Sequence, residues 1–124
     1  MKYLCLAHEE EALFKAMPQE QWLALRQETL DYVESLKASG HLIATHALQS
    51  ANHGVLLRVR NQRLITTDGP FAETKEQLGG IFLVEAQDFN EALRIASQWP
   101  SARLGTIEVR PIEESLREDY RYGD

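Results

Sequence analysis

Apolar positions recur along the chain with two periods, one typical of strands and one typical of helices. Residues 2–7 form a short apolar run that predicts a buried strand, whereas residues 8–17 are mixed and polar, which indicates a surface loop. Between Pro18 and Gly40 the apolar residues follow helical spacing. Proline suits the first helical position and glycine suits the residue after the last, so this segment predicts a helix over 18–39. Its apolar stripe consists of Trp22, Leu25, Leu30, Val33 and Leu36.

The second half of the chain is richer in strand patterns. Asn61-Gln62 predicts a tight turn, so the runs on either side of it form a β-hairpin. Asp88 and Glu91 have the spacing of a helix-capping pair, which predicts a helix over 88–99 that Pro100 ends. The predicted strands of this half cover residues 41–48, 55–59, 63–67, 81–84 and 106–112.

The order of these elements predicts an α+β fold. It runs strand, helix, strand, hairpin, strand, helix, strand, which is the ferredoxin-like, split β-α-β plan with an inserted hairpin. Such a domain has an antiparallel sheet with two helices on one face, and its other face must also be covered. We therefore expect a homodimer whose sheets pack face to face. The domain is expected over 1–112, followed by a charged tail over 113–124 that holds a short helix or frays.

Composition and charge narrow the classes of function. The 124 residues suit one domain, and a net charge of −6 without a basic helix argues against direct nucleic-acid binding. No apolar run approaches the ~20 residues that cross a bilayer. The start of the chain lacks a secretory signal, and the single cysteine, Cys5, fits a reducing compartment as a small buried apolar residue. We therefore expect a cytoplasmic protein with no membrane association.

The most unusual segment is residues 66–80, which contain Asp68, Lys75 and two further acidic residues beside three glycines and a proline. A structural interpretation needs no ligand, since Asp68 can form an Asx-turn and Gly69-Pro70 can fix the chain direction. A functional interpretation is that a loop at a sheet end carries a site. A carboxylate of this segment beside a lysine would then act as an acid–base pair if both were partly buried, with Asp68 as the candidate catalytic residue.

Other candidate residues lie outside this loop. His46 is a candidate acid or base near neutral pH, although an ordinary histidine in solvent or on a sheet face is the simpler interpretation. Arg58, Lys75 and Arg110 are cations for an anionic ligand, and Phe71 is an aromatic residue of the loop. Glu108 shares a strand face with Arg110, and Arg58 on a neighbouring strand would complete a charged cleft. No metal-ligand spacing, G-x-G-x-x-G or P-loop is present, so no metal or nucleotide cofactor is expected.

The string DGPFAETKEQLGG, over residues 68–80, resembles the DGPF branch of the YCII-related proteins. Leu48-Gln49, Arg58-Val59-Arg60 and the segment 107–111 also resemble that family, so the resemblance covers residues 1–112. It implies a ferredoxin-like domain, a dimeric α+β barrel and a cleft near the loop. Related proteins carry a His–Asp pair with the histidine early in the first helix, but the segment 18–22 has none. A His–Asp mechanism is therefore not carried over.

Three functions remain open from the sequence. The leading hypothesis is a protein that binds a small, anionic or polar molecule in the dimer cleft, with acid–base chemistry of lyase or isomerase type. The alternative is a non-catalytic accessory or regulatory protein, because the resemblance implies an association with sigma factors of the extracytoplasmic-function type. A purely structural dimeric module is the third.

Overall fold

The computed structural model of the chain describes residues 1–115 and 121–122. It contains a four-stranded antiparallel sheet with the order β2-β5-β1-β6, and a separate two-stranded sheet made by β3 and β4. The elements, in chain order, are β1 (Lys2–Glu9), α1 (Glu11–Ala16), α2 (Gln19–Ala38), β2 (Leu42–Ala47), the 3-10 turn η1 (Ala51–His53), β3 (Val55–Arg60), β4 (Arg63–Asp68), β5 (Gln77–Glu85), α3 (Phe89–Ser97), the 3-10 turn η2 (Pro100–Arg103) and β6 (Thr106–Pro111).

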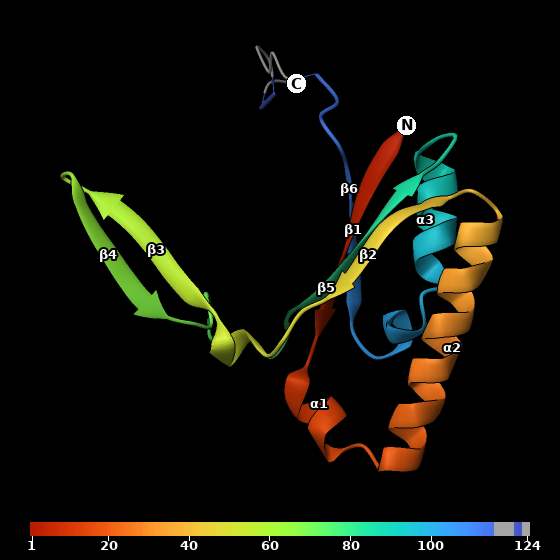
Figure 1. The fold of residues 1–124 in the computed structure, drawn as a ribbon, viewed down its shortest axis with the longest axis horizontal. Helices are drawn as coiled ribbons and strands as arrows, with labels where there is room; N and C mark the ends of the chain where they lie inside the picture. The colour runs from red at the N-terminus through yellow and green to blue at the C-terminus, as the bar shows by residue number, and fades with distance from the viewer. Residues whose placement is uncertain (116–120, 123–124) are drawn as a thin grey trace.

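This arrangement confirms the predicted ferredoxin-like α+β fold. The two long helices, α2 and α3, lie on one face of the main sheet, and the β3–β4 hairpin extends away from the sheet on the other side (Figure 1). Asn61 and Gln62 both have positive φ, which gives the hairpin the tight turn that its right-handed twist favours. The hairpin is thus an insertion between the second and third strands of the basic fold.

The ends of the two long helices follow from their capping residues. Gly40 has a φ of +80° and donates its N–H to the Lys37 carbonyl, while the His41 N–H reaches the Leu36 carbonyl, so α2 ends in a Schellman motif. At the start of α3, the Asp88 carboxylate accepts the Glu91 N–H at 2.8 Å. Both predicted helices are confirmed, although α3 ends at Ser97, two residues before the predicted end.

Two local predictions are wrong. Residues 8 and 9 extend β1 and residues 11–16 form α1, where a surface loop was expected. The short helix is stabilised by tertiary packing, since the Phe14 ring meets the edge of the Trp22 ring with centroids 5.9 Å apart. The strand predicted at 81–84 begins four residues earlier, at Gln77, and pairs with β1 through an irregularity at Gly79.

The core lies between the sheet and the helices. Tyr3, Cys5, Phe82 and Val84 are fully buried, and the Phe82 ring stacks on Trp99 with centroids 4.0 Å apart. Burial raises the pKa of the Cys5 thiol to about 12, so this residue is an inert apolar group, as predicted. Among the described residues, no helix is long and apolar enough to cross a membrane. The short helix considered for the tail falls largely on 116–120, outside the described residues.

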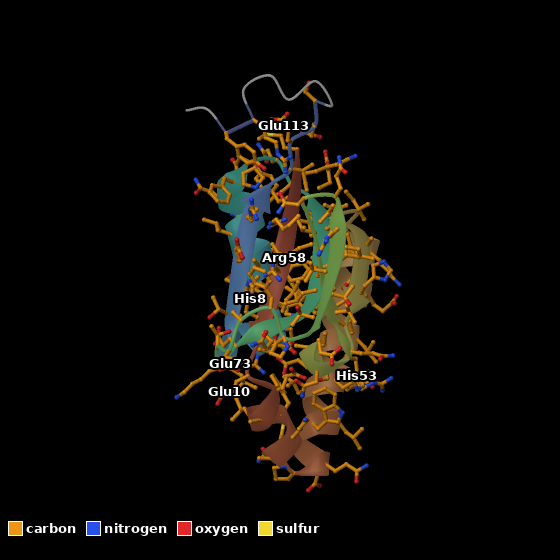
Figure 2. The ribbon with its side chains drawn as sticks, turned by 90° about the vertical axis from the view of Figure 1, so that its left-hand side faces the viewer. His8, Glu10, His53, Arg58, Glu73 and Glu113 are labelled. Atoms are coloured by element: carbon orange, nitrogen blue, oxygen red, sulfur yellow. The ribbon has the colours of Figure 1, made fainter. Side chains whose placement is uncertain are left out.

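Among residues 1–115 and 121–122, no helix lies over the opposite face of the main sheet (Figure 1). Leu4 pairs with Leu83 and Leu6 pairs with Ile81 across neighbouring strands, so four half-buried apolar side chains gather in the middle of this open face. Figure 2 views the molecule from the hairpin side, with Arg58 on the hairpin and His8 on the sheet. The His8 Nε2 lies 2.9 Å from the Glu108 carboxylate at the border of this apolar group.

Candidate functional site

A cavity of about 490 Å³ lies between the first half of α2 and the sheet. It forms because the sheet residues under this part of the helix are small, namely Ala7, Ala47, Gly79 and Gly80. The predicted apolar stripe of α2 therefore splits in two. Val33 and Leu36 are buried in the core, whereas Trp22 is 43% exposed and lines the cavity. The remaining lining residues are Glu9, Phe14, Leu25, Arg26, Thr29, Leu30, Val33, Thr45, His46, Leu48, Ile81, Trp99 and Ser101.

Glu9 is the acidic residue of this cavity. It ends β1, and strand alternation places it on the same face as Cys5 and Ala7, beneath the helices. Burial raises the pKa of the Glu9 carboxyl, and the nearby Glu11 raises it further. The carboxylate lies over Gly79, where any side chain would displace it. The glycine at the strand irregularity therefore leaves the space that Glu9 occupies.

The other polar groups of the cavity differ in their hydrogen bonding. The Thr45 hydroxyl donates to the Ile81 carbonyl at 3.0 Å, and the Thr29 hydroxyl donates to the Leu25 carbonyl at 2.9 Å. The Ser101 Oγ is buried and has no hydrogen-bond partner in the part of the chain that the structure describes. Arg26, on the exposed side of α2, is the cation that lines the cavity. The walls are otherwise mainly apolar and aromatic.

Most of the site residues predicted from the sequence lie elsewhere. Asp68 ends β4 and is exposed, Phe71 is 77% exposed, and Lys75 is exposed in the loop before β5. None of the three lines the cavity. Within residues 1–115 and 121–122, the Asp68 carboxylate has no hydrogen bond, so the Asx-turn considered for it is not formed there.

The predicted charged cleft is not assembled within one chain. Arg110 Nε lies 3.9 Å from the Glu108 carboxylate on β6, as their shared strand face predicts. Arg58, however, lies on β3, which pairs with β4 alone and not with a strand next to β6. His46 is among the residues around the cavity, but it alternates with Thr45 along β2, which directs its exposed ring toward the open face.

The loop after β4 is nevertheless fixed by contacts with η1, which is itself bonded to the start of α1. The Gly69 N–H donates to the Gly54 carbonyl at 2.8 Å, and a Cβ on Gly69 would lie 2.7 Å from the Ala51 carbonyl oxygen. Ala51 in turn donates its N–H to the carboxylate of Glu11, the first residue of α1. Gly69-Pro70 is a cis peptide. The glycine of the motif therefore serves close packing against η1, at the same end of the molecule as Glu10 and Glu73 (Figure 2).

Sequence reasoning missed Glu9 and Ser101. The signal for Glu9 was present, because Tyr3, Cys5, Ala7 and Glu9 alternate along one strand. The predicted strand ended at residue 7, so Glu9 was not recognised as the last residue of its buried face. Ser101 carries no comparable signal, since its burial depends on how η2 packs against the sheet. Among the described residues, no three or more His, Cys, Asp or Glu side chains gather as metal ligands.

The fold and the cavity define an α+β domain of the ferredoxin-like type with a small-molecule-sized cleft between helix and sheet. Residues 1–115 match the YCII-related domain, and the chain belongs to that family. This confirms the resemblance seen in the segment 68–80 at the level of the family.

Two known proteins resemble the whole chain. The uncharacterized protein R00369 of Rhizobium meliloti (strain 1021) is 31% identical over 114 residues, covering 90% of this chain and 92% of that protein. The solved structure of 5-chloro-2-hydroxyhydroquinone dehydrochlorinase (TftG) from Burkholderia phenoliruptrix AC1100, in complex with 2,5-dihydroxybenzoquinone, superposes with a TM-score of 0.57. That match covers 96% of this chain and 100% of TftG at 16% identity, so it supports the fold.

Proposed function

We propose that the protein binds a small molecule in the cavity between α2 and the sheet and moves a proton on it, in chemistry of lyase or isomerase type. The observation that carries this proposal is the Glu9 carboxyl, which lines a largely apolar cavity and has a raised pKa because of its burial. A raised pKa makes the carboxylate a stronger base, and a carboxyl group beside a bound molecule can accept a proton from it and return one to it.

The surroundings of Glu9 suit such a role. As a carboxylate, Glu9 would accept a proton from a carbon or hydroxyl group of the bound molecule. In an isomerisation the same carboxyl returns the proton at another position, and in an elimination it keeps the proton while a leaving group departs with its electron pair. The apolar side chains of Leu25, Leu30 and Trp99 line the same cavity, and low local polarity strengthens electrostatic interactions with a bound molecule. Arg26 provides a cation for an anionic substituent.

TftG gives this proposal a chemical precedent on the same fold. It is a dehydrochlorinase, and its structure contains 2,5-dihydroxybenzoquinone. Dehydrochlorination is an elimination in which a base removes a proton as chloride leaves, so it belongs to the class of chemistry assigned here to Glu9. Hydroxylated quinones and hydroquinones are therefore reasonable first compounds for a screen.

The homodimer expected from the sequence stays a proposal, and the open face supports it. No helix of the described part of the chain covers Leu4, Leu6, Ile81 and Leu83 there. The hairpin exposes four more apolar side chains on one face, namely Val55, Leu57, Val59 and Leu64. A second copy would cover both surfaces. None of the residues of the predicted charged site lines the cavity of a single chain, so that site would have to form between the two copies of the dimer. Its residues are Arg58, Asp68, Phe71, Lys75 and Arg110.

Exchange of substrate protons with solvent tests the proposal without knowledge of the full reaction. A panel of small hydroxylated and carbonyl compounds, including 2,5-dihydroxybenzoquinone, is incubated with the protein in D₂O, and deuterium incorporation is followed by NMR. We expect at least one compound to exchange faster with the parent protein, and Glu9→Gln to lose about 10²-fold or more of that acceleration. Glu10→Gln is the matched control, since Glu10 does not line the cavity. Equal loss in both variants would contradict the role of Glu9.

A further inference from the structure

The Ser101 hydroxyl is a buried polar group that folding does not explain. Ser101 is 7% exposed, and its Oγ has no hydrogen-bond partner among residues 1–115 and 121–122. An unpartnered buried hydroxyl destabilises a folded protein relative to an apolar side chain of similar size. Ser101 also lines the cavity, and because no partner holds its hydroxyl, the side chain can turn about the Cα–Cβ bond toward a bound molecule.

The local structure does not need this hydroxyl. The backbone carbonyl of Ser101 accepts the N–H groups of Leu104 and Gly105, at 3.0 and 2.9 Å, and these bonds close η2 without the side chain. The two threonines of the cavity differ in this respect, because each donates its hydroxyl to a backbone carbonyl. The Ser101 hydroxyl is therefore left without a structural bond.

The rest of the cavity limits what Ser101 can meet. Its charged residues are Glu9 and Arg26, of opposite sign, and the remaining wall is largely apolar with the aromatic rings of Phe14, Trp22 and Trp99. A charged group buried away from these two residues would lose its hydration without compensation. A neutral oxygen on an apolar body would bury that body and give the hydroxyl its missing partner.

We infer that Ser101 is a ligand-binding residue that selects molecules whose part buried next to it is neutral and largely apolar and carries a hydroxyl or carbonyl oxygen, with which its Oγ forms a hydrogen bond. This inference rests on the proposed function, because it takes the same cavity as the binding site. It adds the group that discriminates between ligands, whereas Glu9 is assigned to proton transfer.

A pair of probes that differ by one hydroxyl tests the inference. Phenol and benzene are titrated into ¹⁵N-labelled parent protein and into Ser101→Ala, and the indole N–H signals of Trp22 and Trp99 report on occupancy of the cavity. We expect phenol to bind the parent more tightly than benzene does. Ser101→Ala should weaken phenol binding by about tenfold and leave benzene binding unchanged, since only one hydrogen bond is lost. The variant should also melt at the same temperature as the parent or higher, because it removes an unpartnered buried hydroxyl.

Ser97→Ala is the matched control, because the Ser97 hydroxyl donates to the Arg94 carbonyl on an exposed face of α3. It should change neither affinity. The inference is overturned if phenol does not bind the parent, if Ser101→Ala weakens both probes equally, or if it lowers stability while leaving phenol binding intact. In the last case, with both indole signals still responding to phenol, the cavity remains the binding site and the proposed function stands. Failure of the Glu9→Gln exchange experiment would contradict that function separately.

Discussion

The two faces of the main sheet are built from the same strands, yet they differ in what covers them. On one face, Tyr3 and Cys5 of β1 and Phe82 of β5 are buried beneath α2 and α3. On the other face the alternating residues Leu4 and Leu6 are only half-buried. Strands that are apolar on both sides are typical of sheets covered on both faces. The difference indicates that one chain covers the core face of its sheet by itself, and it favours the proposed second copy as the cover of the other face.

The largest expected change in the free energy of unfolding comes from a substitution on the sheet face that the helices cover. Phe82→Ala removes a fully buried ring that stacks on Trp99, so we expect a loss of about 3–5 kcal/mol in the free energy of unfolding. Leu83→Ala, one residue further along β5 and on the open face, is the matched change. Urea denaturation at low protein concentration should give it a clearly smaller loss. Equal losses would mean that the two faces do not differ as described.

A charged substitution on the open face tests whether that face forms the proposed dimer interface. Leu6→Glu places a carboxylate among the apolar side chains of this face, and an unpartnered charge at an interface costs several kcal/mol. We expect the dimer dissociation constant to rise by roughly 100-fold or more in sedimentation measurements, with an unchanged circular dichroism spectrum. Leu23→Glu, at an exposed position of α2, is the control. If the parent protein is a monomer at micromolar concentration, the prediction of a homodimer is wrong. An accessory role with another protein would then gain support.

The junction between the hairpin and the sheet depends on Gly69. A methyl group there would lie 2.7 Å from the Ala51 carbonyl oxygen and 3.1 Å from that of Gly54. Because both neighbours are backbone atoms, Gly69→Ala should cost about 1–3 kcal/mol in thermal unfolding. Gly54→Ala, whose Cβ would meet the Ala51 oxygen at 3.3 Å, should cost less. A Gly69→Ala protein as stable as the parent would show that the motif glycine is not required for packing.

The smallest expected effect is the pH dependence that Glu9 gives to the melting temperature. Burial raises the pKa of Glu9 above its value in the unfolded chain, so the protonated carboxyl favours the folded state. That contribution is complete below the ordinary glutamate pKa and is lost as the pH rises through the raised value. The melting temperature of Glu9→Gln relative to the parent should therefore be higher at pH 7 than at pH 4. A trend of the opposite sign would argue against a partly buried Glu9.

The sequence predicted the element order well because periodicity and capping are local properties. The alternation in β1, the Pro18 and Gly40 boundaries of α2 and the Asp88 cap all act within a few residues. The first helix, α1, was missed because it has six residues and no side-chain cap, and it depends on packing between Phe14 and Trp22. Such support comes from residues outside the segment itself.

The site was harder to predict than the fold, for a physical reason. The unusual composition of residues 68–80 reflects in part a backbone requirement, the close approach of Gly69 to η1. The cavity, in contrast, arises where ordinary small residues such as Ala7 and Gly80 lie opposite the first half of α2. No sequence motif marks that juxtaposition. Glu9 was within reach through strand alternation, but the unpartnered hydroxyl of Ser101 follows only from tertiary packing.

The most direct test is an NMR titration of the Glu9 side-chain carboxyl carbon, with the parent protein free and saturated with phenol. We expect Glu9 to titrate above the ordinary glutamate range, because it is buried beside Glu11, and its titration curve to change when the cavity is filled. Glu10→Gln should leave both curves unchanged. A Glu9 that titrates at the ordinary glutamate value and does not respond to phenol would contradict the assignment of the cavity as a site of proton transfer.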